Sequence, residues 1–207
     1  MSQLKMYWLA GTAIPDASMP EGYSLTHYAG PQDQLPWVKC CRNGLAGPND
    51  GTEKFENEIL RHADLIPEED VLFLDHAGEH VATITAVYHP DRQIGEVHMV
   101  AVREDYRGKG LAKVINAAAV QKLAREKGLK YIYLTTNAWR KAAVKSYLQA
   151  GFLPVDYAEG DMLDRWKEAL ACIDVKESPF VNEQGEICGS IHAYDHESRQ
   201  RIRNQGR

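Results

Sequence analysis

The sequence lacks several features that mark whole classes of protein. It has no run of about 18 apolar residues, which a membrane-spanning helix requires. It also has no excess of basic residues, because 24 Lys and Arg stand against 29 Asp and Glu. A formal net charge of -5 is unsuited to neutralising phosphate backbones. We therefore expect neither a membrane nor a nucleic acid as a partner.

Cysteines are few, and metal-binding patterns are absent from the sequence. Cys40, Cys41, Cys172 and Cys188 form neither a Cys-x-x-Cys pair nor the dense framework of a secreted domain. The eight histidines are scattered, without the His-Glu-x-x-His pattern of zinc enzymes. We expect reduced thiols in a cytoplasmic protein that carries no metal.

Length and composition favour a single globular domain. The chain has 207 residues and 44% hydrophobic content, enough for one ordinary core. The apolar segment after Lys5 is soon broken by glycine and proline, which favours a short strand or packed arm over a signal peptide. We assign residues 1–173 to the domain. Residues 174–207 form an extension, with a possible hairpin around 182–185 and a loose polar end from Glu197.

Hydrophobic periodicity predicts strands and helices in alternation. Strands are expected over 23–28, 71–75, 80–88, 96–102 and 131–135, and helices over 32–43, 52–66, 110–128, 138–150 and 161–173. Thr52 is the expected N-cap of the second helix, and Gly128 and Gly151 are the expected C-caps of two others. Successive strands joined by helices imply a right-handed crossover, and hence a parallel pair within a mixed α/β sheet.

A glycine-bearing segment joins the strand that ends at Val102 to the next helix. It reads Arg107-Gly108-Lys109-Gly110-Leu111-Ala112. The first turn of a helix has unpaired N–H groups and a partial positive charge, which suit a pyrophosphate. The Walker pattern is excluded, because Lys109 is followed by Gly110 and not by Ser or Thr. By itself the segment is also compatible with a plain tight turn.

Two motifs resemble the GNAT superfamily of acyl-CoA N-acyltransferases. The first is Val100-x-Val102-x-x-x-Tyr106-Arg107-Gly108-Lys109-Gly110-Leu111-Ala112, and the second is Ala143-x-x-x-Tyr147-x-x-x-Gly151-Phe152. The resemblance is clear over about residues 71–155. Residues 134–140 also resemble GNAT members grouped with mycothiol-synthase-like proteins. The resemblance implies the GNAT fold, a central mixed sheet with a splayed parallel pair flanked by helices.

The resemblance also implies acetyl-CoA as the co-substrate and assigns residues to it. The implied contacts are the strand Val100, Ala101 and Val102, the turn Arg107, Gly108, Lys109, Gly110, Leu111 and Ala112, and the later pair Asn137 and Arg140. One position departs from the family pattern, because Arg140 stands where an asparagine is usual. Asn137 lies one turn earlier and is alternatively the N-cap of its helix. A monomer or a homodimer is expected.

The implied reaction is direct acetyl transfer to an amine in a ternary complex. An alkylammonium is neutral only about one part in 2,500 at pH 7, a handicap of ~4.6 kcal/mol, so a base is needed. The resemblance makes Glu96 a candidate, because it stands six residues before Val102, where some GNAT members have their general-base glutamate. His98 is the second candidate, and on a regular strand both share a face with Val100 and Val102. The resemblance makes Tyr147 the acid that protonates the leaving thiolate.

Each of these roles has an alternative that the sequence leaves open. Glu96 could be a solvated strand-end carboxylate, His98 a half-buried structural histidine, and Tyr147 a core tyrosine. An acyl intermediate on Cys40 or Cys41 is disfavoured, because no His or Asp is spaced to activate either thiol. A small amine is the favoured acceptor, with a protein amine as the alternative. A non-catalytic acyl-CoA sensor is the competing function from another class.

Overall fold

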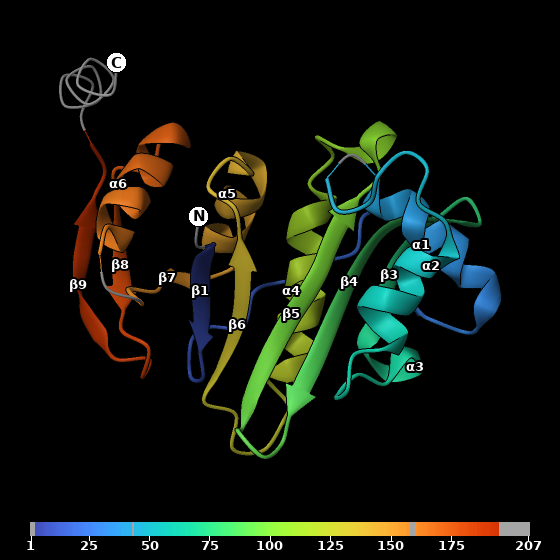
Figure 1. Ribbon diagram of the computed structural model, residues 1–207, viewed down its shortest axis with the longest axis horizontal. Coiled ribbons are helices and arrows are strands. Elements are labelled where there is room, and N and C mark those ends of the chain that lie inside the picture. Colours follow the sequence, from blue (N-terminus) through green and yellow to red (C-terminus); the bar gives the residue numbers. More distant parts are fainter. Residues whose placement is uncertain (1–2, 43, 158–159, 195–207) are drawn as a thin grey trace. The chain divides into compact units, whose positions relative to one another are not determined.

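The computed structural model describes residues 3–42, 44–157 and 160–194, along which strands and helices alternate (Figure 1). This alternation confirms the predicted mixed α/β class. The chain divides into two units, a larger one of Ala10–Ile132 and a smaller one of Met1–Leu9 with Tyr133–Arg207. No helix in the described part of the chain is both long enough and apolar enough to cross a membrane.

Four strands of the larger unit form an antiparallel sheet in chain order. They are β2 (Tyr23–His27), β3 (Val71–His76), β4 (Glu79–His89) and β5 (Ile94–Val102). β3 and β4 form a hairpin whose turn contains Gly78, with a φ of +80° that other residues rarely adopt. The periodicity of the sequence predicts all four strands to within two residues at each end.

Helices cover both faces of this sheet, and they are short except for one. The helical segments are η1 (Pro31–Asp33), α1 (Gln34–Cys41), α2 (Thr52–Phe55), η2 (Glu56–Leu60), α3 (Pro67–Asp70), η3 (Glu104–Tyr106) and α4 (Leu111–Leu123). On one face, Trp37 of α1 meets Phe55 of α2 edge to face at 5.2 Å, in a buried cluster that includes Val87 of β4. On the other face Leu123 of α4 packs against Gly95, where a Cβ would lie only 3.0 Å from it. Figure 1 shows α4 behind β4 and β5.

Three helix boundaries of the larger unit differ from expectation. The segment expected to be helical over 32–43 is the 3-10 turn η1 followed by α1. Gly51, and not Thr52, is the N-cap of α2, which widens after one turn into the π-helical η2. α4 ends at Leu123, because the residues after it are half-buried or exposed and offer no apolar stripe. Gly128, with a φ of +77°, bends the chain toward the next strand instead of capping α4.

The smaller unit contains the remaining elements. They are β1 (Leu4–Leu9), most of β6 (Tyr131–Thr136), α5 (Lys141–Gln149), β7 (Leu153–Pro154), α6 (Met162–Cys172), β8 (Glu177–Val181) and β9 (Ile187–His192). Of the two alternatives for the N-terminal segment, β1 is the short strand, and it pairs antiparallel with β7, where Met6 faces Pro154. β8 and β9 form the hairpin predicted around residues 182–185. The polar end predicted from Glu197 lies outside the described residues.

The C-terminal end of α5 has the predicted Schellman cap. The Phe152 N–H donates to the Tyr147 carbonyl, and the Gly151 N–H donates to the Leu148 carbonyl, each at 3.0 Å. The rings of Tyr147 and Phe152 complete the cap with centroids 6.1 Å apart. The cap therefore fixes the end of the helix that carries Tyr147.

The start of α5 corrects the expectation for Asn137. The N-cap is Arg140 and the first helical residue is Lys141. Asn137 instead closes a turn, in which its carbonyl accepts the Arg140 N–H at 2.9 Å. The helix begins three residues later than expected because this turn occupies residues 137–140. Asn137 is therefore not an N-cap.

Candidate active site

The turn between β5 and α4 has a backbone that suits glycine at two positions. Gly108 has a φ of +77° and Gly110 has a φ of +78°. A Cβ at either position would meet no atom within 4 Å, so conformation and not crowding requires glycine here. Both residues leave open space in front of the turn, as a backbone cradle for an anion does.

Helix geometry and basic side chains make this turn attractive to negative charge. Gly110 is the N-cap of α4, and the N–H groups of Leu111 and Ala112 lie in the first helical turn, which has no intrahelical acceptors for them. Arg107 donates from Nε to the Val102 carbonyl at 3.2 Å. Lys109 places Nζ 4.4 Å from the centre of the ring of Tyr106. The predicted phosphate-binding residues thus form one continuous basic turn.

A bulge interrupts β5 just before this turn. His98 faces Thr85 and Ala101 faces Thr83, so Met99 and Val100 together oppose a single residue of β4. Met99 has a φ of +50°, which is uncommon for a residue with a side chain. A bulge leaves backbone groups unpaired, as a strand that receives an extra partner requires. The extra residue also reverses the alternation of side chains beyond it.

The bulge corrects the expected distribution of side chains on β5. Paired residues of antiparallel strands point to the same face, so Glu96, His98 and Ala101 share a face with their partners on β4. Val102 pairs with Ala82 and lies on the opposite face. Val102 therefore does not share a face with Glu96 and His98, as it would on a regular strand.

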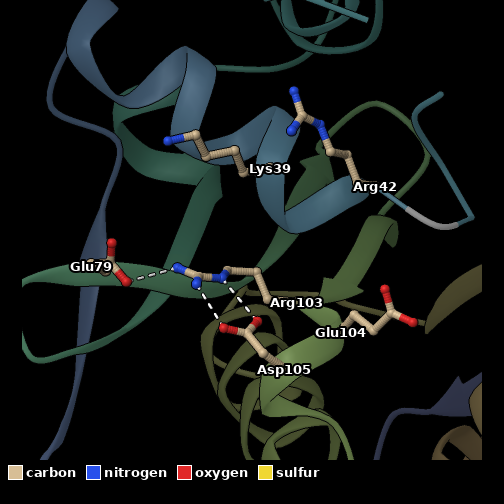
Figure 2. Close-up of a pocket in the computed structure, with 6 residues that line it drawn as sticks. All are labelled: Lys39, Arg42, Glu79, Arg103, Glu104 and Asp105. Carbon is tan, nitrogen blue, oxygen red and sulfur yellow. Dashed lines mark hydrogen bonds and ion pairs between the residues drawn. The ribbon is translucent and has the colours of Figure 1, made fainter. Parts of the chain in front are cut away.

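A surface pocket of about 280 Å³ opens beside the C-terminal end of β5 (Figure 2). Its lining residues are Lys39, Arg42, Glu79, Arg103, Glu104 and Asp105. Arg103 pairs with Glu79 at 2.9 Å and with Asp105 at 2.8 Å, and the hydrogen bond to Asp105 is the main reason why the pKa of Arg103 is raised. Figure 2 shows Arg42 pointing away from these pairs. Three basic and three acidic residues balance here, and none of the predicted site residues lines the pocket.

The two base candidates lie in one cluster of histidines and carboxylates. Glu96 Oε2 lies 3.0 Å from His89 Nε2 and 3.7 Å from His62 Nε2. His98 Nε2 lies 3.6 Å from Oε2 of Glu58, a residue of the π-helical η2. Burial is the main cause that lowers the pKa of His98, against the opposing charges of Glu96 and Glu58. His98 is therefore neutral at pH 7, and the same burial makes it a weaker base.

Sequence reasoning did not identify two members of this cluster, His62 and His89. His89 ends β4, and the short turn into β5 brings it diagonally across from Glu96. The length of that turn was a usable signal, because a hairpin between the two strands fixes this neighbourhood. No local pattern marks His62, which follows η2. Among the described residues, no group of three or more His, Cys, Asp or Glu side chains is placed to hold a metal ion.

Tyr147, the predicted acid, is buried on α5 of the smaller unit. Its exposed fraction is 6%. Burial raises the pKa of Tyr147 to about 12, and the nearby charge of Arg140 opposes this shift. The phenol is therefore a proton or hydrogen-bond donor throughout the neutral range. Arg140 belongs to the same unit, at the N-cap of the same helix.

The cysteines of α1 are poor nucleophiles. Burial raises the pKa of Cys40 to about 12 and that of Cys41 well above its usual value. A thiol with a pKa of about 12 is ionised to only about one part in 100,000 at pH 7. Cys40 is further occupied as a donor to the His80 carbonyl at 3.4 Å. An acyl-cysteine intermediate thus has no support in the structure.

Comparison with known proteins identifies the family. A sequence model described as the acetyltransferase (GNAT) family matches residues 35–152, more than half of the chain. The chain belongs to the GNAT family. The match includes β5, the glycine turn, α4 and α5, and it ends at Phe152. α6 and the β8–β9 hairpin lie beyond it.

Curated relatives of this GNAT chain share one name. The chain is 30% identical over 160 residues to mycothiol acetyltransferase of Paenarthrobacter aurescens, covering 73% of this chain and 49% of the relative. It is 31% identical over 162 residues to mycothiol acetyltransferase of Nocardia farcinica, covering 70% and 50%. The chain therefore spans about half the length of the curated relatives it matches.

Solved structures show the same fold as this GNAT chain. A GCN5-related N-acetyltransferase from Sphaerobacter thermophilus matches with a TM-score of 0.57 and 19% identity, over 74% of this chain and 49% of that one. A second, from Kribbella flavida, matches with a TM-score of 0.52 and 20% identity, over 74% and 55%. At these identities the likeness shows the fold alone. The predicted GNAT fold is thereby confirmed.

The predicted site residues are divided between the two units. The larger unit holds the bulged strand, the glycine turn and both base candidates, and it brings Glu96 and His98 into one cluster. The smaller unit holds Tyr147, Asn137 and Arg140. The roles of all these residues stay predictions.

Proposed function

We propose that the chain is an N-acetyltransferase that moves the acetyl group of acetyl-CoA directly to a primary amine, on a small molecule rather than a protein. The carrying observation is the cradle formed by Gly108 and Gly110 at the start of α4, directly after a bulged strand. Membership of the GNAT family and the name of the curated relatives support acetyl transfer as the reaction class.

The residues of the larger unit fit the co-substrate. Backbone N–H groups of the Gly108–Ala112 turn would hold the pyrophosphate, with Arg107 and Lys109 adding positive charge. The backbone groups of Val100 to Val102 that do not pair with β4 would pair with the amide-bearing arm of CoA as another strand does. Asn137 and Arg140 would add contacts from the turn before α5. The thioester itself supplies the activated acetyl group.

Deprotonation of the acceptor is the first task of the protein side chains. An alkylammonium resists deprotonation by ~4.6 kcal/mol at pH 7, so a base must accept its proton. His98 can accept it because its imidazole is neutral at pH 7, although its lowered pKa makes the transfer from the ammonium more uphill. Glu96 carries the negative charge that attracts the ammonium and stabilises the protonated base. The two candidates thus divide the work.

Assistance to the leaving thiolate is the second task. A phenol with a pKa of about 12 would lose about 5 kcal/mol on full proton transfer to a thiolate whose thiol has a pKa near 8.5. Tyr147 therefore contributes first as a hydrogen-bond donor to the developing negative charge. Arg140 favours any further transfer, because its charge lowers the pKa of the phenol.

Release of free CoA thiol across a panel of acceptors tests the proposal. The panel contains small primary amines, and a second arm contains peptides with free α- and ε-amines. We expect thiol release and acetylated product with at least one small amine, at turnover in the usual range of about 1–10³ s⁻¹. Turnover with peptides alone makes the acceptor a protein amine. Tight acetyl-CoA binding without turnover in either arm makes the chain a sensor.

A further inference from the structure

Hydrogen bonds of His89 connect the side chain of Glu96 to that of Asp64. His89 is only 4% exposed, and its Nδ1 lies 2.9 Å from Asp64 Oδ2 while its Nε2 lies 3.0 Å from Glu96 Oε2. His89 thus bridges the carboxylates of Asp64 and Glu96 through its two ring nitrogens. One oxygen of Glu96 is thereby fixed, and the carboxylate is oriented on the sheet. Glu96 is built as a fixed negative charge.

His62 approaches the same oxygen of Glu96 that His89 contacts. Its Nε2 is 3.7 Å from Glu96 Oε2, and its ring centroid is 5.9 Å from that of His98 and 6.3 Å from that of His89. Its Nδ1 is buried and has no hydrogen-bond partner among the described residues. The side chain as a whole keeps 25% of its surface exposed. His62 thus touches both the buried cluster and solvent.

The backbone around His62 explains how it reaches this place. η2 has one π-type turn, in which the Arg61 N–H donates to the Glu56 carbonyl at 3.0 Å. Such single turns rotate the following residues relative to a regular helix and recur at functional sites. The His62 N–H then closes the segment on the Ile59 carbonyl at 3.1 Å. The irregular turn aims His62 at β5.

We propose that His62 is a further residue of the proton-accepting site, and that His98 and His62 together carry the acceptor's proton to solvent while Glu96 serves as their fixed counter-ion. The proposal rests on the proposed function, because the proton comes from the acceptor amine. The proposal assigns proton transfer to the two histidines and charge stabilisation to Glu96. The acceptor it implies is a primary amine that arrives as a cation, since Glu96 borders both rings and Glu58 borders the ring of His98.

The proton balance of the reaction is as follows. His98 takes one N–H proton from the ammonium, and the freed lone pair forms the C–N bond to the thioester carbonyl as the C–S bond breaks. His98 passes this proton to His62, through water across the gap between the rings, and His62 releases it to solvent. Tyr147 hydrogen-bonds the departing thiolate, and the second N–H proton of the amine ends on the CoA thiol. One proton is released per amide formed.

The pH dependence of kcat/KM tests the assignment through two opposite shifts. The charged groups facing His98 are Glu96 on its own strand, Glu58 of η2 and His62, with Lys54 of α2 paired to Glu58 at 2.6 Å. His62 lowers the pKa of His98, whereas Glu96 raises it. The acidic limb of kcat/KM should therefore move to higher pH in His62→Gln and to lower pH in Glu96→Gln. His62→Gln should also lower kcat/KM at pH 7 by about tenfold or more.

An NMR titration gives a readout that does not need turnover. In ¹³C- and ¹⁵N-labelled protein, the titration midpoint of the His98 ring should rise in His62→Gln and fall in Glu96→Gln. His27→Gln is the matched control, because His27 is exposed on β2 of the same unit and should leave both the midpoint and the rate profile unchanged. Circular dichroism checks that each variant folds.

The outcomes separate this inference from the proposed function. If the wild type is active and His62→Gln keeps the same acidic limb and the same kcat/KM, the role of His62 is overturned. The proposed acetyltransferase function is then unaffected. A His98 midpoint that ignores both substitutions overturns the coupled cluster, whatever the activity. A wild type that turns over no amine overturns the proposed function, and with it the proton route, even where the NMR coupling is observed.

Discussion

At the scale of single residues, Tyr147 gives the sharpest test of the proposed chemistry. Tyr147→Phe removes only a hydroxyl, so acetyl-CoA affinity should stay within a few-fold while kcat falls by about 10²-fold. Because the pKa of Tyr147 is raised to about 12, the wild type should show no alkaline limb from this group below about pH 11. Stopped assays measure kcat and its pH dependence, and calorimetry measures the acetyl-CoA affinity.

The matched control for this substitution is Tyr7→Phe in the same unit. Tyr7 is 4% exposed, and its hydroxyl bonds the Glu183 carbonyl at 3.4 Å. Its loss should change stability without a selective loss of kcat. Equal turnover by the wild type and Tyr147→Phe would remove Tyr147 from the mechanism.

His98 also makes the stability of the fold depend on pH. Because its pKa is lowered in the folded chain, protonation favours the unfolded state, in which an ordinary histidine titrates near 6.5. The contribution of neutral His98 is present above that pH and is lost as the pH falls through the folded value. Urea unfolding at pH 7 and pH 5 should therefore show a larger loss of free energy in the wild type than in His98→Gln. A loss of equal size in both would contradict the shift.

The residues of the site differ in how far the sequence could identify them. Glycines at a helix start and Tyr147 before a Gly-Phe cap are local patterns, and local patterns are readable without the fold. Glu96 is identified through the family resemblance, and His98 because it shares a face with Glu96 on a regular strand segment. His62 and His89 are not identified from the sequence, because their contacts with Glu96 depend on a π turn and on strand register. Both features belong to the tertiary structure and have no local pattern in the sequence.

At the scale of elements, the glycine turn can be tested against a glycine of the same conformation. Gly110→Trp and Gly11→Trp both place a side chain at positive φ, +78° and +88°, where a Cβ meets nothing within 4 Å. Each should lose about 1–2 kcal/mol of stability from backbone strain. Only Gly110→Trp should lose acetyl-CoA affinity, by about 100-fold or more in calorimetry, because its side chain fills the cradle. Unchanged affinity in Gly110→Trp would show that the phosphate site lies elsewhere.

Prediction of whole elements succeeded where the signal is local and failed where the backbone is irregular. The β3–β4 hairpin and the Schellman cap of α5 follow from turn and cap residues. The predicted start of α5 is three residues too early, because the turn at Asn137 resembles an N-cap in sequence. The bulge at Met99 reverses the side-chain alternation of β5, and methionine gives no local sign of a positive φ.

At the scale of the whole molecule, the two units make the extent of the acetyl-CoA site measurable. A ligand at 100 times its Kd raises the free energy of unfolding by about 2.7 kcal/mol wherever its binding requires the folded state. The proposed contacts include Asn137 and Arg140 of the smaller unit as well as the turn of the larger unit. Acetyl-CoA should therefore slow amide hydrogen exchange in α5 as well as in α4. In Gly110→Trp neither helix should be protected. Protection confined to α4 would restrict the site to the larger unit and remove Asn137 and Arg140 from it, whereas protection of α5 that survives in Gly110→Trp would place the primary contacts on the smaller unit.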